Sequence, residues 1–186
     1  GQQYQVERLD YEEKKAYVRK VDVDYYTDAN LAVDIKVLDV FRQKQDIMAQ
    51  SYIGEVMVTS LATMFKKIKL FTHENIGSGP IQLPPEEMHT TAFWLSAPED
   101  LEDLSKEEMQ SGLLGLCHVM TNIAPFYLMG DPRDIRGVVQ IRSPFTQLPT
   151  LYLYDSYPGG TGYSEKLYDL SQELLKASRR VILECS

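Results

Sequence analysis

The spacing of apolar residues changes near residue 73, and this change limits the folds open to the chain. Before it, apolar and polar residues alternate in short runs, which is the pattern of antiparallel strands. After it, runs with a helical period alternate with runs typical of strands. We therefore predict an α+β chain. Residues 1–72 would form a small antiparallel, barrel-like β domain, and residues 73–186 an α/β domain with two main helices packed on a mixed sheet.

The first part contains five predicted strands, separated by polar turns at residues 10–13, 27–30 and 43–46. The third run has a mixed period, so we expect a bulge or a strong bend in it. Five short strands joined by tight turns favour a small barrel. The predicted strands are residues 4–9, 15–26, 32–41, 52–60 and 64–71.

The second part contains two predicted helices. Ser105 and Glu108 form a capping box ahead of an apolar stripe that reaches Ala124, which predicts a largely buried first helix. Cys117 falls on that stripe and is expected to be a small core residue. The second helix is predicted from Tyr163 to about Arg180. Strands are predicted at residues 90–95, 137–142, 150–154 and 181–183.

The net charge of −8 lies entirely in the second part, because residues 1–72 contain 11 basic and 11 acidic residues and residues 73–186 contain 8 and 16. Binding to a phosphate backbone depends largely on Lys and Arg. Strong non-specific nucleic-acid binding is therefore not expected, and any DNA contact must be local. The candidates, each of which could also be an ordinary surface or core residue, are a lysine cluster and three tyrosines that could stack on bases: Lys66, Lys67, Lys69, Tyr25, Tyr26 and Tyr157.

No stretch approaches the roughly 20 apolar residues that a membrane span needs, and the first residues lack the features of a signal peptide. The two cysteines, Cys117 and Cys185, do not make a disulfide framework. We therefore expect a cytoplasmic protein with no membrane partner.

A glycine-rich loop, Pro158-Gly-Gly-Thr-Gly162, joins the strand ending near Asp155 to the second helix. Glycines permit positive φ, and the free N–H groups at a helix N-terminus attract anions. The loop could thus hold a phosphate through Gly159, Gly160 and Gly162, as in a regulatory module, or it could be a sharp turn that holds the helix against the sheet. It matches neither the P-loop nor the dinucleotide-binding fingerprint.

Four polar residues lie at predicted element ends or on the first helix: His118, Asp131, Asp134 and Asp155. Together they could form a metal-dependent hydrolase or nuclease site. The alternative is that the aspartates cap turns and helices, and that His118 is a hydrogen-bonded core residue. Signatures of a serine nucleophile or of a zinc protease are absent from the sequence.

The segment from Leu151 to Glu165, with the helix and the cysteine that follow, resembles the zinc-binding domain of MrfA/YprA-type DNA helicases. Residues 89–94, the helix bearing His118, and residues 129–137 are similar to that domain in order and spacing. Residues 17–34 resemble the small β-rich segment that precedes it. The resemblance covers nearly the whole chain.

This resemblance implies a parent protein that is an ATP-dependent superfamily 2 helicase, moves 3′ to 5′ on single-stranded DNA and acts in DNA repair. The sequence contains no Walker A motif, no D-E-x-H box and no helicase arginine motif. We therefore expect a non-catalytic C-terminal accessory module. Its partners would be the motor lobes of the same polypeptide and DNA, and ATP and magnesium would bind only to the motor.

The resemblance also implies a zinc site of four cysteines, of which only the first maps onto this chain, at Cys185. A structural zinc ion needs four ligands. The chain ends at Ser186, so we expect an incomplete site and no bound cofactor in this fragment.

Overall fold

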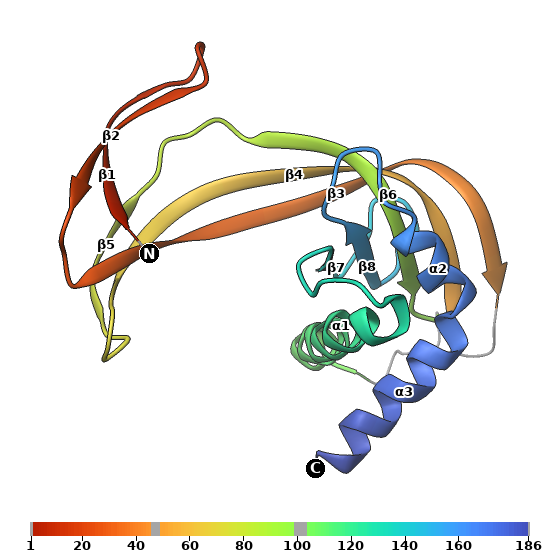
Figure 1. Cartoon of the computed structure of the whole chain (residues 1–186). Coiled ribbons are helices and arrows are strands. Elements are labelled where there is room, and N and C mark those ends of the chain that lie inside the picture. Colours follow the sequence, from red (N-terminus) through yellow and green to blue (C-terminus); the bar gives the residue numbers. More distant parts are fainter. Residues whose placement is uncertain (1, 46–48, 99–103, 186) are drawn as a thin grey trace. The chain divides into compact units, whose positions relative to one another are not determined.

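The computed structural model describes residues 2–45, 49–98 and 104–185. Strands and helices are both abundant in it, so the predicted α+β class is confirmed (Figure 1). In chain order the elements are β1 (Gln3–Asp10), β2 (Lys15–Val21), β3 (Tyr25–Gln45), β4 (Gln50–Lys69), β5 (Asn75–Pro80), β6 (Glu86–Ser96), α1 (Lys106–Leu128), β7 (Ile135–Gln140), β8 (Thr150–Asp155), α2 (Tyr163–Asp169) and α3 (Ser171–Glu184).

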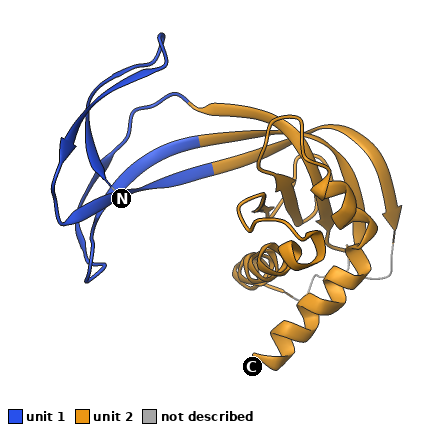
Figure 2. Ribbon diagram, in the orientation of Figure 1, with its two compact units in different colours: residues 1–32, 61–84 blue, residues 33–60, 85–186 orange. Residues whose placement is uncertain are grey.

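The chain forms two compact units, and neither is a continuous stretch of sequence (Figure 2). Unit 1 contains residues 1–32 and 61–84, and unit 2 contains residues 33–60 and 85–186. The boundary expected between residues 72 and 73 does not coincide with this division, because the long strands β3 and β4 each contribute residues to both units.

Unit 1 contains the antiparallel β1–β2 hairpin and the antiparallel pair of β4 with β5. The described strands form no closed barrel, so the small barrel expected here is wrong. Residues 27–30, expected to be a turn, lie inside β3, and two of the expected short strands are one continuous strand, β4. A barrel closes when its first and last strands pair, but among the described residues β1 and β2 pair only with each other. Of the third expected turn, Gln43–Gln45 belong to β3 and Asp46 lies outside the described residues.

Unit 2 is built on a sheet with the strand order β3-β4-β6-β8-β7. The pairs of β4 with β6, β6 with β8 and β7 with β8 are all antiparallel, where a mixed sheet was expected. On one face, Phe93 and Leu153 pack with residues of α1, α2 and α3, including Met120, Leu167 and Leu174. The three helices therefore cover this face.

The opposite face of the same sheet buries its own core, which includes Ile35, Trp94 and Tyr152. The Gln140 side chain on β7 donates hydrogen bonds to the Ile35 carbonyl and the Asp34 carboxylate on β3. Since β3 and β7 are the two ends of the strand order, these bonds join the outer edges of the sheet. The sheet is therefore strongly curved around this second core, and among the described residues no backbone pairing closes it.

The capping box predicted at the start of α1 is confirmed. The Ser105 hydroxyl accepts from the Glu108 backbone N–H, and the Glu108 carboxylate accepts from the Ser105 N–H. These bonds lower the pKa of Glu108. The helix continues past Pro125 and ends at Met129, which has a left-handed backbone conformation.

The second predicted helix is broken at Leu170 into α2 and α3. The strand expected at residues 181–183 is wrong, since these residues continue α3 and the Cys185 N–H still donates to the Val181 carbonyl. A helix satisfies its backbone groups within one segment, whereas a strand would need a neighbouring edge. Among the described residues, no helix has the length and apolar character to span a membrane.

Candidate functional site

The glycine loop surrounds the buried carboxylate of Asp155, at the end of β8. Asp155 Oδ2 accepts from the backbone N–H and the hydroxyl of Thr161. Asp155 Oδ1 accepts from the backbone N–H and the hydroxyl of Ser164, in the first turn of α2. Backbone N–H groups at a helix N-terminus favour an anion. Here that anion is a carboxylate of the chain itself.

The glycines of the loop adopt conformations that other residues disfavour, with φ of +79° at Gly159 and Gly160 and +84° at Gly162. The Gly159 N–H donates to the His89 carbonyl at 2.8 Å, and the Gly160 N–H donates to the Tyr157 carbonyl at 3.0 Å.

Since these loop amides have protein acceptors, the structure supports the sharp-turn alternative and gives no support to a phosphate site. Pro158 is an exposed residue at the start of the loop.

Asp131 and Asp134 shape the turn before β7. The Asp131 carboxylate accepts from the Arg133 guanidinium at 2.9 Å and from the Arg133 backbone N–H, and these bonds lower the pKa of Asp131 to about 2. Asp134 accepts from the Asp131 N–H and from the Tyr157 hydroxyl, and the bond to Asp134 raises the pKa of Tyr157. Both aspartates therefore act as turn-forming residues.

His118 is exposed on α1 and is not the core residue that the alternative interpretation predicted. An apolar stripe covers only part of a helix surface, and His118 lies outside the buried part. Among the described residues, no three His, Cys, Asp or Glu side chains form a group that could hold a metal ion. The structure thus does not assemble the hydrolase site considered for His118, Asp131, Asp134 and Asp155.

The lysine cluster lies on β4 in unit 1. Lys66 and Lys67 point to opposite faces of the strand, since neighbouring side chains alternate. The Lys67 ammonium lies 5.2 Å from the ring centre of Tyr25, a cation–π contact within the unit. Tyr26 and Tyr157 are exposed, so they are accessible for stacking.

Cys185 is exposed and free at the end of α3, whereas Cys117 is buried on α1, and burial raises the pKa of its thiol. The described residues therefore do not fit a complete zinc site, and Cys185 could supply one ligand.

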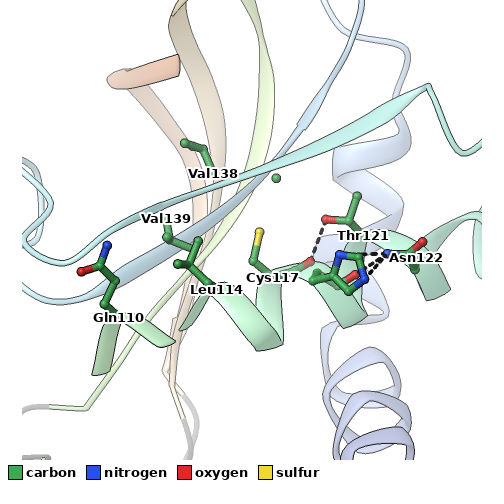
Figure 3. A pocket seen from close by; sticks show the side chains of 9 residues that line it. Gln110, Leu114, Cys117, Thr121, Asn122, Val138 and Val139 are labelled. Atoms are coloured by element: carbon green, nitrogen blue, oxygen red, sulfur yellow. Dashed lines mark hydrogen bonds between the residues drawn. The ribbon is translucent and has the colours of Figure 1, made fainter. Parts of the chain in front are cut away.

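A groove of about 570 Å³ lies between α1 and β7 (Figure 3). Its apolar part includes Leu114, Cys117 and Val139, and its polar part includes His118 and Asn122. The Asn122 side chain donates to the His118 carbonyl at 2.8 Å. No Asp, Glu, Lys or Arg of the described residues lines the groove.

Sequence reasoning missed two groups of residues. Thr90 holds the glycine loop, since its hydroxyl lies 2.9 Å from the carbonyl oxygens of Asp155 and Tyr157. The only signal in the sequence was weak: Thr90 is a polar residue at the start of an apolar strand segment. The groove was missed too, although Gln110, Leu114, His118 and Asn122 recur at a spacing of four and thus share one helix face.

Comparison with known proteins gives this architecture its context. Residues 116–186 match the MrfA Zn-binding domain family. Over 185 residues the chain is 49% identical to the uncharacterized ATP-dependent helicase YprA of Bacillus subtilis, with all of this chain and 25% of YprA covered. The chain resembles one quarter of an MrfA/YprA-type helicase. The predicted resemblance to these helicases is therefore confirmed.

Further comparisons agree. The crystal structure of the DUF1998 helicase MrfA bound to DNA matches with a TM-score of 0.74 and 49% identity, over all of this chain and 25% of that one. A second MrfA crystal structure matches with a TM-score of 0.66 and 39% identity, again over 25% of its chain. The ATP-dependent helicase HRQ1 of Saccharomyces cerevisiae is 23% identical over 18% of its length.

Proposed function

We propose that this chain is a non-catalytic, C-terminal accessory module of an ATP-dependent 3′ to 5′ DNA helicase that acts in DNA repair. The observation that carries the proposal is the match of the whole chain, at 49% identity, to one quarter of a helicase. The lack of ATP-binding motifs in the sequence agrees with it. The module would help motor lobes elsewhere in the polypeptide, which bind ATP and magnesium, to engage single-stranded DNA and to separate strands.

The MrfA structure bound to DNA supports DNA as a partner of the intact protein. Within this chain we propose that Lys66, Lys67 and Lys69 contribute cations for the phosphate backbone. The cytoplasm is the proposed location. Free cysteines such as Cys117 and Cys185 are usual in that reducing compartment.

The lysine cluster can be tested in the intact helicase. We expect replacement of Lys66, Lys67 and Lys69 by Gln to weaken binding to single-stranded DNA several-fold and to flatten its dependence on salt. The matched control replaces three exposed lysines elsewhere with the same loss of charge: Lys36, Lys106 and Lys176. Equal weakening in both variants would show that net charge, and not this cluster, determines binding.

The accessory role itself is tested by comparing ATP hydrolysis with unwinding of a forked duplex. The isolated chain should hydrolyse no ATP, with or without DNA. In the intact helicase, deletion of this module should reduce unwinding at least tenfold and leave DNA-stimulated ATP hydrolysis within about twofold. A parallel loss of both activities would place the module in the motor's own function and contradict the proposal.

Zinc content tests the role of Cys185. We propose that this thiolate is one ligand of a zinc ion in the intact helicase, with the other ligands outside this chain. Elemental analysis should find one zinc per helicase molecule and less in the Cys185→Ser variant. Cys117→Ser is the control, because Cys117 is buried on α1 and, among the described residues, belongs to no group of side chains that could hold a metal ion. Unchanged zinc in Cys185→Ser would refute the assignment.

A further inference from the structure

In unit 1 (Figure 2), strand β4 pairs with β3 and with β5, and one face of this small sheet carries cations beside aromatic rings. Side chains alternate between the two faces of a strand, so Phe65, Lys67 and Lys69 share one face and Lys66 lies on the other. The contact between the Lys67 ammonium and the Tyr25 ring places Tyr25 on the same face as Lys67. The lysine cluster is therefore divided between two faces.

Two glycines of β5 lie opposite the aromatic ring and the first lysine. Phe65 pairs with Gly79, and Lys67 pairs with Gly77. A Cβ at Gly79 would lie 2.8 Å from the Phe65 ring, so the ring lies against the β5 backbone. Phe65 is partly exposed, and within the described parts of the chain no second ring stacks on it. The Phe65 ring is therefore available to a flat apolar group.

The lysines of this face have no carboxylate partner, unlike cations of the β1–β2 hairpin. On the hairpin, Arg19 forms an ion pair with Glu7 at 2.8 Å. Among the described residues, no carboxylate lies within ion-pair distance of Lys67 or Lys69. The Glu74 carboxylate, just before β5, accepts from a neighbouring hydroxyl group instead. Two uncompensated cations thus lie beside the Phe65 ring.

We propose that this face binds single-stranded DNA, with a base stacked on Phe65 and neighbouring phosphates bound by Lys67 and Lys69. Cations and aromatic rings together are the means by which proteins hold a single strand. Tyr25 is a positioning residue, because its ring holds the Lys67 ammonium. The inference rests on the proposed function and deepens it, since it assigns the larger part of the lysine cluster's role to Lys67 and Lys69.

The ring and the charges together decide the kind of partner. An acidic peptide would pair with the lysines but would leave Phe65 without a partner. In a duplex the bases stack on each other and cannot reach a side chain. Residues 1–32 and 61–84 contain 8 basic and 8 acidic residues, so the acidic excess of the chain lies wholly in unit 2. Unit 1 as a whole therefore does not repel a polyanion.

Cross-linking to the unmodified, intact helicase tests the proposal without any variant. A single-stranded oligonucleotide that contains iodouracil is irradiated in the complex, and mass spectrometry locates the adduct. The adduct should lie on Phe65, and adducts found only elsewhere in the polypeptide would overturn the proposal. Unwinding is measured on the same preparation and on the helicase without this module. If unwinding needs the module but Phe65 gives no adduct, the stacking site fails and the accessory role stands.

Variants of the intact helicase separate stacking from charge. Phe65→Leu should weaken binding of the oligonucleotide about fivefold to tenfold and leave its salt dependence unchanged, because no charge is lost. Lys67→Gln should lower the slope of log affinity against log salt by about 0.7, for one phosphate contact. Lys66→Gln, the matched control on the opposite face, should leave this slope nearly unchanged.

Two results in these variants would refute the proposal. Equal slopes in Lys66→Gln and Lys67→Gln would show that the face does not matter. Unchanged affinity in Phe65→Leu, with a loss in Lys67→Gln, would show a surface that binds any acidic chain through charge alone.

A pair of glycine variants tests the placement of the ring. Gly79→Ala adds a methyl group where the Phe65 ring lies and should displace the ring, so the oligonucleotide should bind about as weakly as to Phe65→Leu. Gly77→Ala is the control, because its Cβ would lie 3.8 Å from the Lys67 side chain, an ordinary contact. Unchanged affinity in Gly79→Ala, or equal weakening in both glycine variants, would contradict a base stacked on Phe65.

Discussion

The two units differ in what they bury. Every buried hydrophobic residue of the described chain lies in unit 2, and no described residue of unit 1, at 2–32 and 61–84, is buried. Unit 1 instead exposes apolar side chains on one face of the β1–β2 hairpin, where Val6 pairs with Val18 and Leu9 pairs with Ala16. Isolated two-stranded sheets are marginally stable in water. Unit 2 thus has its own core, whereas the described residues of unit 1 are held mainly by backbone pairing.

The largest expected effect is a difference in amide hydrogen exchange between the two units of the isolated chain. It is also the most direct test of whether unit 1 lacks stability of its own. Amides of β1 and β2 should exchange at least about 1,000-fold faster than those of the central strands β6 and β8, because local opening of an unpacked hairpin needs far less free energy than global unfolding. Site-resolved exchange by NMR measures both. Equal protection in the two places would show that unit 1 has stability of its own.

A phenylalanine from each unit sharpens the comparison. Phe93, on β6, is 0% exposed and packs against Tyr168, whereas Phe71 in unit 1 is 90% exposed. Phe93→Ala should lower the free energy of unfolding by about 3–5 kcal/mol, since it leaves a cavity in the core. Phe71→Ala should change it by less than about 0.5 kcal/mol. Urea denaturation checks both, and a cost above about 1 kcal/mol at Phe71 would reveal packing in unit 1.

The sequence predicted the features of unit 2 that depend on local signals. The capping box at Ser105 and the loop ahead of the helix at Tyr163 appear where expected, because capping bonds and positive-φ glycines act over a few residues. The prediction was wrong where pairing between strands distant in sequence determines the structure. The turn expected at residues 27–30 is part of β3, since polar residues are tolerated on a strand exposed to solvent.

The candidate site was harder to predict for the same reason. Asp155, His118 and Asp134 are polar residues of a kind that catalysis uses, but only the fold determines whether they meet. Asp155 is enclosed by Thr161 and Ser164, and His118 faces solvent. The position of β7 at one end of the sheet is a property of strand order, which no single stretch of sequence contains.

Substitutions at two neighbouring glycines of unit 2 test whether the glycine loop packs against β6. Gly159 and Gly160 have the same positive φ, but a Cβ at Gly160 would overlap Thr91 on β6, and a Cβ at Gly159 would meet open space. Gly159→Ala should cost about 1–2 kcal/mol, the penalty of a left-handed conformation. Gly160→Ala should cost about 1–3 kcal/mol more because of overpacking. Thermal unfolding measures the difference, and equal costs would mean that the loop is not held against β6.

The smallest expected effect concerns an exposed turn of unit 2. The hydrogen bonds from Arg133 hold the pKa of Asp131 at about 2, below its usual value of 3.8. Because the folded-state pKa is lowered, the turn's contribution to stability is present above about pH 4 and is lost as the pH falls toward 2. In Arg133→Ala the Asp131 pKa should rise toward 3.8 without reaching it, since the backbone N–H of residue 133 remains a donor.

Carboxyl titration by NMR measures this pKa directly, with Arg136→Ala as the control for removing a nearby exposed cation. If Arg136→Ala raised the Asp131 pKa as much as Arg133→Ala, general charge and not the specific hydrogen bonds would account for it. A shift confined to Arg133→Ala would show that even the exposed turns of unit 2 have defined side-chain geometry. Exposure to solvent would then not by itself explain the difference between the units, because an exposed part of unit 2 would be well ordered. The lack of a buried core in unit 1 would remain as the explanation.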